Sequence, residues 1–151
     1  MIELIIIDQY QVILEPRKKY QKVIFWQGYD YINDKKNISI LNFIENNSDE
    51  IKKIYLKWIE ELGNIQIYKG IPVYKYLKIK NKFSFWWQSF FIQKSNYEHS
   101  PHINDSIKLI ALQKWMLNKK IFHIKLYTNN KKLAKCLSEF ANNKKIKFEN
   151  K

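Results

Sequence analysis

The thirty residues that precede the C-terminal lysine, IFHIKLYTNNKKLAKCLSEFANNKKIKFEN, constrain the fold more than any other stretch. Residues 121–127 are rich in β-branched and aromatic side chains, which predicts a strand. Apolar side chains recur at helical spacing over 133–140, and residues 146–148 return to an extended pattern. A strand, a helix and a second strand in this order form a βαβ unit, which pairs its strands in parallel through a right-handed crossover. The tail therefore predicts a parallel sheet.

Two further strands and two helices are predicted upstream of this unit. The runs LIIID at 4–8 and KVIFW at 22–26 are short and apolar, as buried strands are. The clearest helix covers 48–63, where acidic residues occupy the first turn and a glycine stands at the end. A second helix is expected to begin with Asn104 or Asp105 as its cap. Strands that alternate with helices predict an α/β fold with a mostly parallel sheet and helices on both faces.

Length and cysteine content indicate the class and the compartment. A chain of 151 residues suits one α/β domain over residues 1–151. Its one cysteine, Cys136, excludes a disulfide within the chain and is typical of cytoplasmic proteins. No apolar run approaches the roughly 20 residues that span a membrane, and the N-terminal MIELIIIDQY lacks a basic leader and a cleavage site. We therefore expect a cytoplasmic protein.

The net charge of +13 suggests nucleic acid as a partner, but the kind of basic residue argues against it. Arg17 is the one arginine among the 27 basic residues. Base edges and phosphates are recognised best by the planar fork of arginine. The scattered lysines instead indicate a solvated surface, or attraction to acidic ligands or to a membrane surface. Nucleic acid is therefore not the partner that we expect.

The stretch FSFWWQSFFIQKSNYEHSPHIND, at 83–105, concentrates the aromatic residues. At 100° per residue its rings, including Trp86 and Trp87, fall on one broad helical face, with Lys94 in the middle of that face and Gln93 at its edge. The helix could simply pack in a core, with the lysine reaching out to solvent. Its indoles could instead form a platform for a sugar or a base, with the lysine meeting a carboxylate or a phosphate. A surface for a protein partner is the third interpretation.

The loop EHSPH offers a weaker chemical signal. His99 and His102 are three residues apart, but a proline lies between them and no fourth fixed ligand follows. We therefore expect no metal site there. A free histidine titrates near neutral pH, so His99 is the candidate general base. The alternative for His99 is an exposed loop residue without a role.

Glycine is scarce where a nucleotide-binding loop would need it. The chain has three glycines, and neither a G-x-G-x-x-G pattern nor a P-loop occurs. The turn of the βαβ unit, YTNNKK, contains none, whereas a bound pyrophosphate normally requires glycine close to a helix N-terminus. We expect no donor-nucleotide site within these residues.

The segment FSFWWQSFFIQKS, followed by SPHINDSIKLIALQKWM, resembles part of the bacterial surface carbohydrate biosynthesis proteins. These are glycosyltransferases encoded with lipopolysaccharide or capsule genes. The resemblance rests on the following residues: Trp86, Trp87, Lys94, Ser95, Ser100, Pro101, Asp105, Lys108, Leu109, Ala111 and Leu112. It covers about thirty residues strongly and the βαβ tail more loosely. Many members have a glutamate where this chain has Gln93, so a carboxylate role is not transferred to that position.

The resemblance implies the N-terminal, Rossmann-like half of a longer, two-domain glycosyltransferase of the GT-B type. Such a half generally holds the carbohydrate acceptor, and the sugar nucleotide is expected only in the missing half, so no cofactor is expected in this chain. The residues that the resemblance points to for substrate binding are Trp86, Trp87, Gln93, Lys94, Ser95 and Asp105. The implied function is lipopolysaccharide or capsule assembly in the cytoplasm, or peripherally at the inner membrane, whose anionic lipids attract lysine. This chain by itself is expected to be inactive.

Two other interpretations stay open at the level of sequence. The chain could be a non-catalytic binding module for nucleic acid or for a protein partner. It could also be the remnant of a split gene. Donor, acceptor, linkage and oligomeric state are not indicated by the residues.

Overall fold

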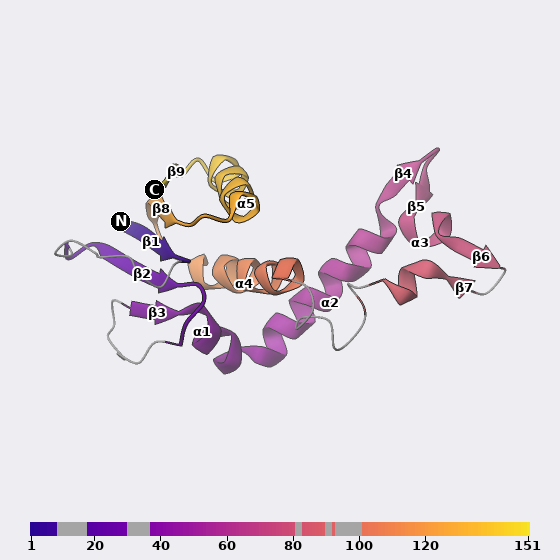
Figure 1. Cartoon of the computed structure of the whole chain (residues 1–151), viewed down its shortest axis with the longest axis horizontal. Coiled ribbons are helices and arrows are strands. Elements are labelled where there is room, and N and C mark those ends of the chain that lie inside the picture. The colour runs from indigo at the N-terminus through magenta and orange to yellow at the C-terminus, as the bar shows by residue number, and fades with distance from the viewer. Residues whose placement is uncertain (9–17, 30–36, 81–82, 90–91, 93–100) are drawn as a thin grey trace. The chain divides into compact units, whose positions relative to one another are not determined.

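A computed structural model describes residues 1–8, 18–29, 37–80, 83–89, 92 and 101–151 (Figure 1). The chain divides into two compact units. The first, here called the sheet unit, joins Met1–Asn47 to Ala111–Lys151, and the second, the insert unit, is Ser48–Ile110. Because the second is inserted in the sequence of the first, each unit is described by itself. Folding as a single domain stays a prediction.

The sheet unit is built on five strands in the order β3-β2-β1-β8-β9. All four neighbouring pairs are parallel, which confirms the α/β, Rossmann-like fold with a parallel sheet. The strands are β1 (Ile2–Ile7), β2 (Gln21–Phe25), β3 (Asn37–Ser39), β8 (Ile121–Tyr127) and β9 (Lys147–Asn150). The predicted strand–helix–strand tail is present, with α5 (Lys131–Asn143) between β8 and β9.

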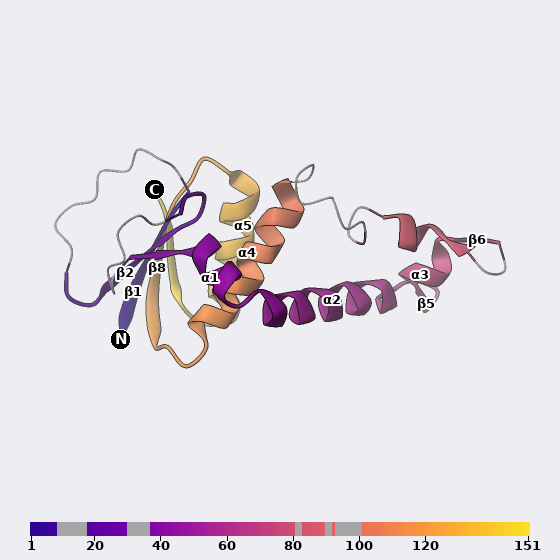
Figure 2. The ribbon, with the colours of Figure 1, turned by 90° about the horizontal axis from the view of Figure 1, so that it is seen from below.

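One face of this sheet forms the main core. Alternate residues of three neighbouring strands are fully buried there: Leu4, Ile6, Ile24, Ile124 and Leu126. The end of α4 (Pro101–Met116) and α5 lie on the same side of the sheet, as Figure 2 shows. Their buried residues include Leu112 and Leu137, both fully enclosed. Close packing of apolar side chains between helix and sheet is the main stabilising contribution to such a layer.

The connections from β1 to β2 and from β2 to β3 are only partly described. Residues 9–17 join β1 to β2 and residues 30–36 join β2 to β3, and both stretches lie outside the described residues. Helices over both faces therefore stay a prediction. After β3 the chain enters α1 (Ile40–Asn46), where the Ser39 hydroxyl accepts a hydrogen bond from the Asn42 N–H at 3.2 Å. The run ISILNFI thus contains both a strand end and a capped helix.

The insert unit begins with α2 (Ser48–Asn64), close to the predicted bounds and with Asp49 and Glu50 in its first turn. Short elements follow: β4 (Gln66–Tyr68), β5 (Ile71–Pro72), α3 (Val73–Tyr76), β6 (Lys78–Lys80), β7 (Phe83–Ser84) and the 3₁₀ helix η1 (Phe85–Gln88). β4 pairs with β5 and β6 with β7, both antiparallel. The first part of α4 completes this unit.

The prediction of one amphipathic α-helix from Phe83 onward is wrong over the described residues. Phe83–Ser84 is a strand, and Phe85–Gln88 is one turn of 3₁₀ helix. The Ser84 hydroxyl accepts from the Trp86 N–H at 3.2 Å and donates to the Tyr74 carbonyl at 2.5 Å, so it fixes the start of this turn. Aromatic residues also favour strands, and here a partner strand was present to pair with them.

The start of α4 also differs from the prediction. The helix begins at Pro101, not after a cap at Asn104 or Asp105, so Asp105 lies inside it. Proline is favoured in the first turn because its missing N–H would have no helical partner there. Asn104 and Asp105, which the sequence indicated as caps, therefore lie within the helix.

Candidate functional site

The order of the strands indicates where a ligand would bind in the sheet unit. From β1 the chain proceeds to β2 and β3 on one side, whereas β8 and β9 lie on the other side. The order therefore reverses between β1 and β8. Open parallel sheets bind their ligands outside the carboxyl ends of the strands at such a point. Asp8 directly follows β1, and Thr128 directly follows β8.

These two residues are joined at the carboxyl edge. One Asp8 carboxylate oxygen, Oδ2, accepts a hydrogen bond from the Thr128 hydroxyl at 2.5 Å. The other, Oδ1, accepts from the Gln27 side-chain amide at 2.7 Å, and the Asp8 N–H donates to the Tyr127 carbonyl at 3.0 Å. Residues that follow three adjacent strands, β2, β1 and β8, thus meet. We call Asp8, Gln27 and Thr128 the edge cluster.

The chemistry of the edge cluster suits hydroxyl groups. Each carboxylate oxygen can accept two hydrogen bonds, so the two contacts leave Asp8 with acceptor capacity. The Thr128 side chain is buried, whereas Gln27 is exposed. The buried hydroxyl positions the carboxylate, and the exposed amide adds a group that can both donate and accept. Such a set can hold a polyol by hydrogen bonds.

The turn that leads into α5 uses its backbone N–H groups internally. The Asn130 side chain accepts from the N–H groups of Lys132 and Leu133, both at 3.1 Å. The Thr128 hydroxyl accepts from the Asn130 N–H at 2.9 Å. A phosphate at this helix N-terminus would have to compete with these side-chain oxygens for the donors.

A second set of polar side chains links three neighbouring strands, β2, β1 and β8, near their amino ends. Glu3 in β1 is buried, with 6 % of its surface exposed. Its Oε1 lies 3.0 Å from the His123 Nδ1 and 3.0 Å from the Lys125 Nζ, and its Oε2 accepts from the Gln21 amide at 2.5 Å. Parallel register brings these side chains together, because Glu3 pairs with both Gln21 and His123. We call this set the Glu3 network.

The Glu3 network holds its carboxylate in the charged form. Burial raises the pKa of Glu3, but hydrogen bonds from Gln21 and Lys125, the charge of Lys125 and the contact with His123 together outweigh burial and lower it. The pKa of Lys125 is raised, chiefly by its hydrogen bond to Glu3. A buried carboxylate that is kept ionised by three donors is a poor base. His123, which the sequence places inside a strand, therefore belongs to an electrostatic contact across strands.

Acid is expected to weaken the sheet unit through Glu3. The folded state lowers the pKa of Glu3 below its ordinary value of 4.5, so the unfolded chain takes up the proton more readily. The resulting stabilisation is complete above that value and is lost as the pH falls through the folded-state pKa. Urea unfolding between about pH 6 and pH 3 should show a shallower loss of unfolding free energy for Glu3→Gln than for the wild type. Equal slopes for both proteins would contradict this role of Glu3.

The residues that the sequence singled out for substrate binding do not form one face. Trp86 is 7 % exposed, whereas Trp87 is 60 % exposed, because successive residues of a 3₁₀ helix point about 120° apart. A β-carbon on Gly63 would lie 2.9 Å from the Trp86 Nε1, so this indole packs directly on the α2 backbone. Asp105 is half-buried inside α4. Trp87 is thus the tryptophan of this pair that a ligand can reach.

The remaining predicted site residues lie outside the described residues. They are Gln93, Lys94, Ser95 and His99. Their proposed roles in holding a substrate or transferring a proton stay predictions. The edge cluster was missed at the level of sequence, although Asp8 and the TNN turn stand directly after predicted strands. Lys108 in α4 is part of the resemblance, but its burial, with 2 % of its surface exposed, was not predicted from the sequence.

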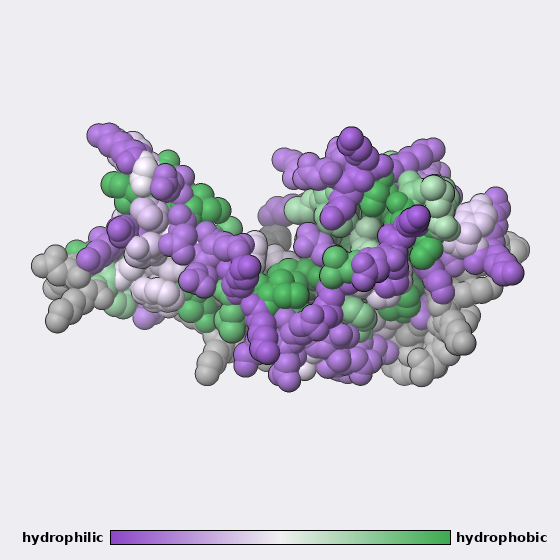
Figure 3. All heavy atoms as spheres, turned by 180° about the vertical axis from the view of Figure 1, so that it is seen from behind, coloured by the Kyte–Doolittle hydropathy of each residue, from purple (hydrophilic) through white to green (hydrophobic). Residues whose placement is uncertain are grey.

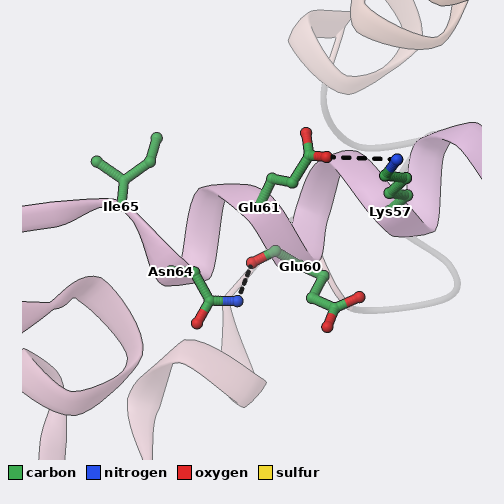
Figure 4. Close-up of a pocket in the computed structure, with 5 residues that line it drawn as sticks. All are labelled: Lys57, Glu60, Glu61, Asn64 and Ile65. Atoms are coloured by element: carbon green, nitrogen blue, oxygen red, sulfur yellow. Dashed lines mark hydrogen bonds and ion pairs between the residues drawn. The ribbon is translucent and has the colours of Figure 1, made fainter.

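A shallow hollow also lies at the C-terminal end of α2. It is lined by Lys57, Glu60, Glu61, Asn64 and Ile65. The Lys57 Nζ and the Glu61 Oε1 lie 3.9 Å apart. In Figure 4 the Glu60 carboxylate points away from this pair. The Asn64 amide donates to the Glu60 carbonyl at 2.9 Å. Exposed contacts of this kind within one helix contribute little, and they do not converge on a ligand.

Neither a metal site nor a membrane-spanning helix is found among the described residues. Within them, no group of three or more histidine, cysteine, aspartate or glutamate side chains could hold a metal ion. Among their helices, none combines the length and the apolar composition of a membrane-spanning segment. The chain was then compared with family models, with curated proteins and with solved structures, and none of them matches it.

Proposed function

We propose that this chain is the acceptor-side half of a glycosyltransferase that assembles lipopolysaccharide or capsule in the cytoplasm, peripherally at the inner membrane. The observation that carries the proposal is the edge cluster, which lies at the reversal point of a Rossmann-ordered sheet. Carboxylate, amide and hydroxyl groups are suited to sugar hydroxyls. The resemblance around Trp86 and Trp87 supports the same class, and Trp87 offers an exposed indole for stacking on a sugar.

The proposal assigns the two transferase substrates to different places. The acceptor sugar lies at the carboxyl edge of the sheet unit, with Asp8 accepting hydrogen bonds from its hydroxyl groups. The sugar-nucleotide donor binds in a second half outside this chain, because the turn before α5 lacks glycine and its N–H groups bond to Thr128 and Asn130. A non-catalytic binding module is the alternative. The apolar, lysine-rich surface of the insert unit favours it, since such a surface can bind a partner without chemistry.

Asp8→Asn is expected to weaken carbohydrate binding about 10- to 100-fold, which corresponds to one charge-assisted hydrogen bond. The chain is first screened against an array of O-antigen and capsular oligosaccharides, and the best binder is then titrated by calorimetry. Glu139→Gln is the matched control, because it removes an exposed carboxylate from the same unit, away from the carboxyl edge. Absence of any bound glycan, or equal affinity of the wild type and Asp8→Asn, would refute the proposed acceptor site.

A further inference from the structure

Part of the insert unit carries no acidic residue. Residues 62–97 contain neither aspartate nor glutamate, and we call them the acid-free segment. They include six lysines, at 69, 75, 78, 80, 82 and 94. They also include ten aromatic residues, at 68, 74, 76, 83, 85, 86, 87, 90, 91 and 97. Residues 106–138 also lack acidic residues and contain eight lysines, but they include only three aromatic residues, at 115, 122 and 127. The acid-free segment is therefore set apart by its aromatic content and not by its charge.

The described apolar residues of the acid-free segment are exposed to an unusual degree. Of the seventeen large apolar side chains exposed in the described residues, ten belong to this segment. They are Ile65, Ile67, Tyr68, Ile71, Tyr76, Leu77, Ile79, Phe83, Phe85 and Trp87. Figure 3 shows green and pale side chains of this unit, at the left, directly beside purple hydrophilic ones. Scattered apolar residues are normal on a surface, but a concentration of this kind marks an interaction site.

Short antiparallel pairs explain this exposure. β4 and β5 are joined at Lys69 and Gly70, both with positive φ, as a tight hairpin turn requires. The rings of Tyr68 and Tyr76 lie 6.2 Å apart, and the Lys69 Nζ lies 5.3 Å from the Tyr68 ring centroid. Two-stranded pairs have too few side chains to cover both of their faces. Aromatic rings and lysine ammonium groups are therefore exposed side by side around the β4–β5 hairpin.

We propose that the described part of the acid-free segment, residues 62–80 and 83–89, is a docking surface for an anionic phospholipid bilayer. Tyrosine and tryptophan prefer the level of the lipid headgroups, where a ring can bury its apolar body and keep its polar atoms wet. Lysines attract anionic headgroups, and the segment itself contributes no carboxylate that would repel them, although Glu60 and Glu61 of α2 lie beside it at Ile65. The exposed Lys69, Lys75 and Lys78 supply the charge, and Phe85 and Trp87 insert beside them.

The aliphatic side chains and the choice of cation favour lipid over other occupants. Ile65, Ile67 and Ile79 are each at least half exposed, and such groups gain nothing from stacking with bases. The segment has no arginine to read phosphates or base edges. Lysine is depleted at the centre of protein–protein interfaces, whereas here it alternates with the rings. An anionic bilayer suits both the isoleucines and the lysines, because its acyl chains take up aliphatic side chains and its headgroups attract ammonium groups.

The inference deepens the proposed function, since it assigns residues to the membrane location, but its test requires neither glycan nor turnover. Chain 1–151 is mixed with sedimentable vesicles of phosphatidylcholine, or of equal parts phosphatidylcholine and phosphatidylglycerol. Each lysine near the surface contributes a factor of about five, so three lysines should give about 100-fold stronger binding to the anionic vesicles. This preference should fall as salt is raised.

Two exposed-site variants locate the contact. Lys75→Glu with Lys78→Glu is expected to weaken binding to anionic vesicles about 25-fold or more, because two attractive charges are lost. Phe85→Ser with Trp87→Ser should weaken it about tenfold or more through lost apolar burial. Lys131→Glu with Lys135→Glu on α5 makes the same charge change outside the segment, and Leu117→Ser removes one exposed apolar side chain there. Circular dichroism confirms that every variant is folded.

Five outcomes would overturn the inference. The wild type could bind neither vesicle, or both equally. The segment variants could bind anionic vesicles as tightly as the wild type and the controls do. A single-stranded oligonucleotide at physiological salt could bind more tightly than vesicles and lose affinity in the same variants, which would assign the surface to nucleic acid. Sedimentation velocity could show a dimer that Phe85→Ser with Trp87→Ser dissociates without any effect on vesicles, which would assign it to a second copy.

Discussion

Replacement of Trp86 by alanine is expected to lower the free energy of unfolding of the insert unit by about 3–5 kcal/mol. The indole is nearly fully buried and lies against Gly63 in α2, so its removal leaves a cavity beside a helix backbone. It also removes the packing that holds η1 in place. Urea unfolding, with amide hydrogen exchange in α2 as a local probe, measures the loss.

The neighbouring Trp87 provides the matched control. The same substitution there should cost less than about 1 kcal/mol, because its side chain is largely in solvent. Two adjacent and identical residues thus separate packing from ligand contact. Similar losses at both positions would contradict the packing of η1, whereas the expected difference leaves Trp87 as the tryptophan of the pair available for sugar or lipid.

Replacement of Glu3 by alanine is expected to cost the sheet unit about 2–3 kcal/mol. The change leaves the Lys125 ammonium, the His123 Nδ1–H and the Gln21 amide without their common acceptor. The Lys125 side chain is 27 % exposed, so water compensates part of this loss. Thermal and urea unfolding of the variant measure it.

A double variant tests whether the cost arises from the uncompensated charge. Glu3→Ala combined with Lys125→Met should be less destabilised than the sum of the two single changes, because the second change removes the stranded ammonium. Strictly additive losses would show that the Glu3–Lys125 ion pair contributes nothing and that the cost arises from packing and from the contacts of Glu3 with Gln21 and His123.

Local sequence patterns predicted the elements whose neighbours are close in the chain. The tail with β8, α5 and β9 follows from its periodicity, and α2 follows from its acidic first turn and its apolar stripe. The aromatic stretch was misassigned because rings at helical spacing equally suit a strand and a 3₁₀ turn. The choice between them was made by pairing with Lys78–Lys80 and by packing on Gly63, neither of which a local pattern contains.

The candidate site depends on contacts that no local pattern includes. Asp8 and Thr128 are 120 positions apart, as are Glu3 and His123. Glu3 and His123 lie within strands, and Asp8 and Thr128 directly follow strands, but nothing in the local sequence indicates that β1 and β8 are neighbours. The strand ends could be predicted, but the strand order, which joins them into a cluster, could not.

The central position of β1 has a consequence for biosynthesis. This strand is made before the insert unit, yet one of its two neighbours, β8, is made only after that unit. The insert unit is complete earlier and has its own internal pairs, so it can fold while β1 still has an open edge. Long-range parallel pairing is slow, and an unpaired apolar strand such as IELIII invites aggregation. Nascent chains halted before residue 121 should therefore depend on chaperones far more than chains that already include β8 and β9.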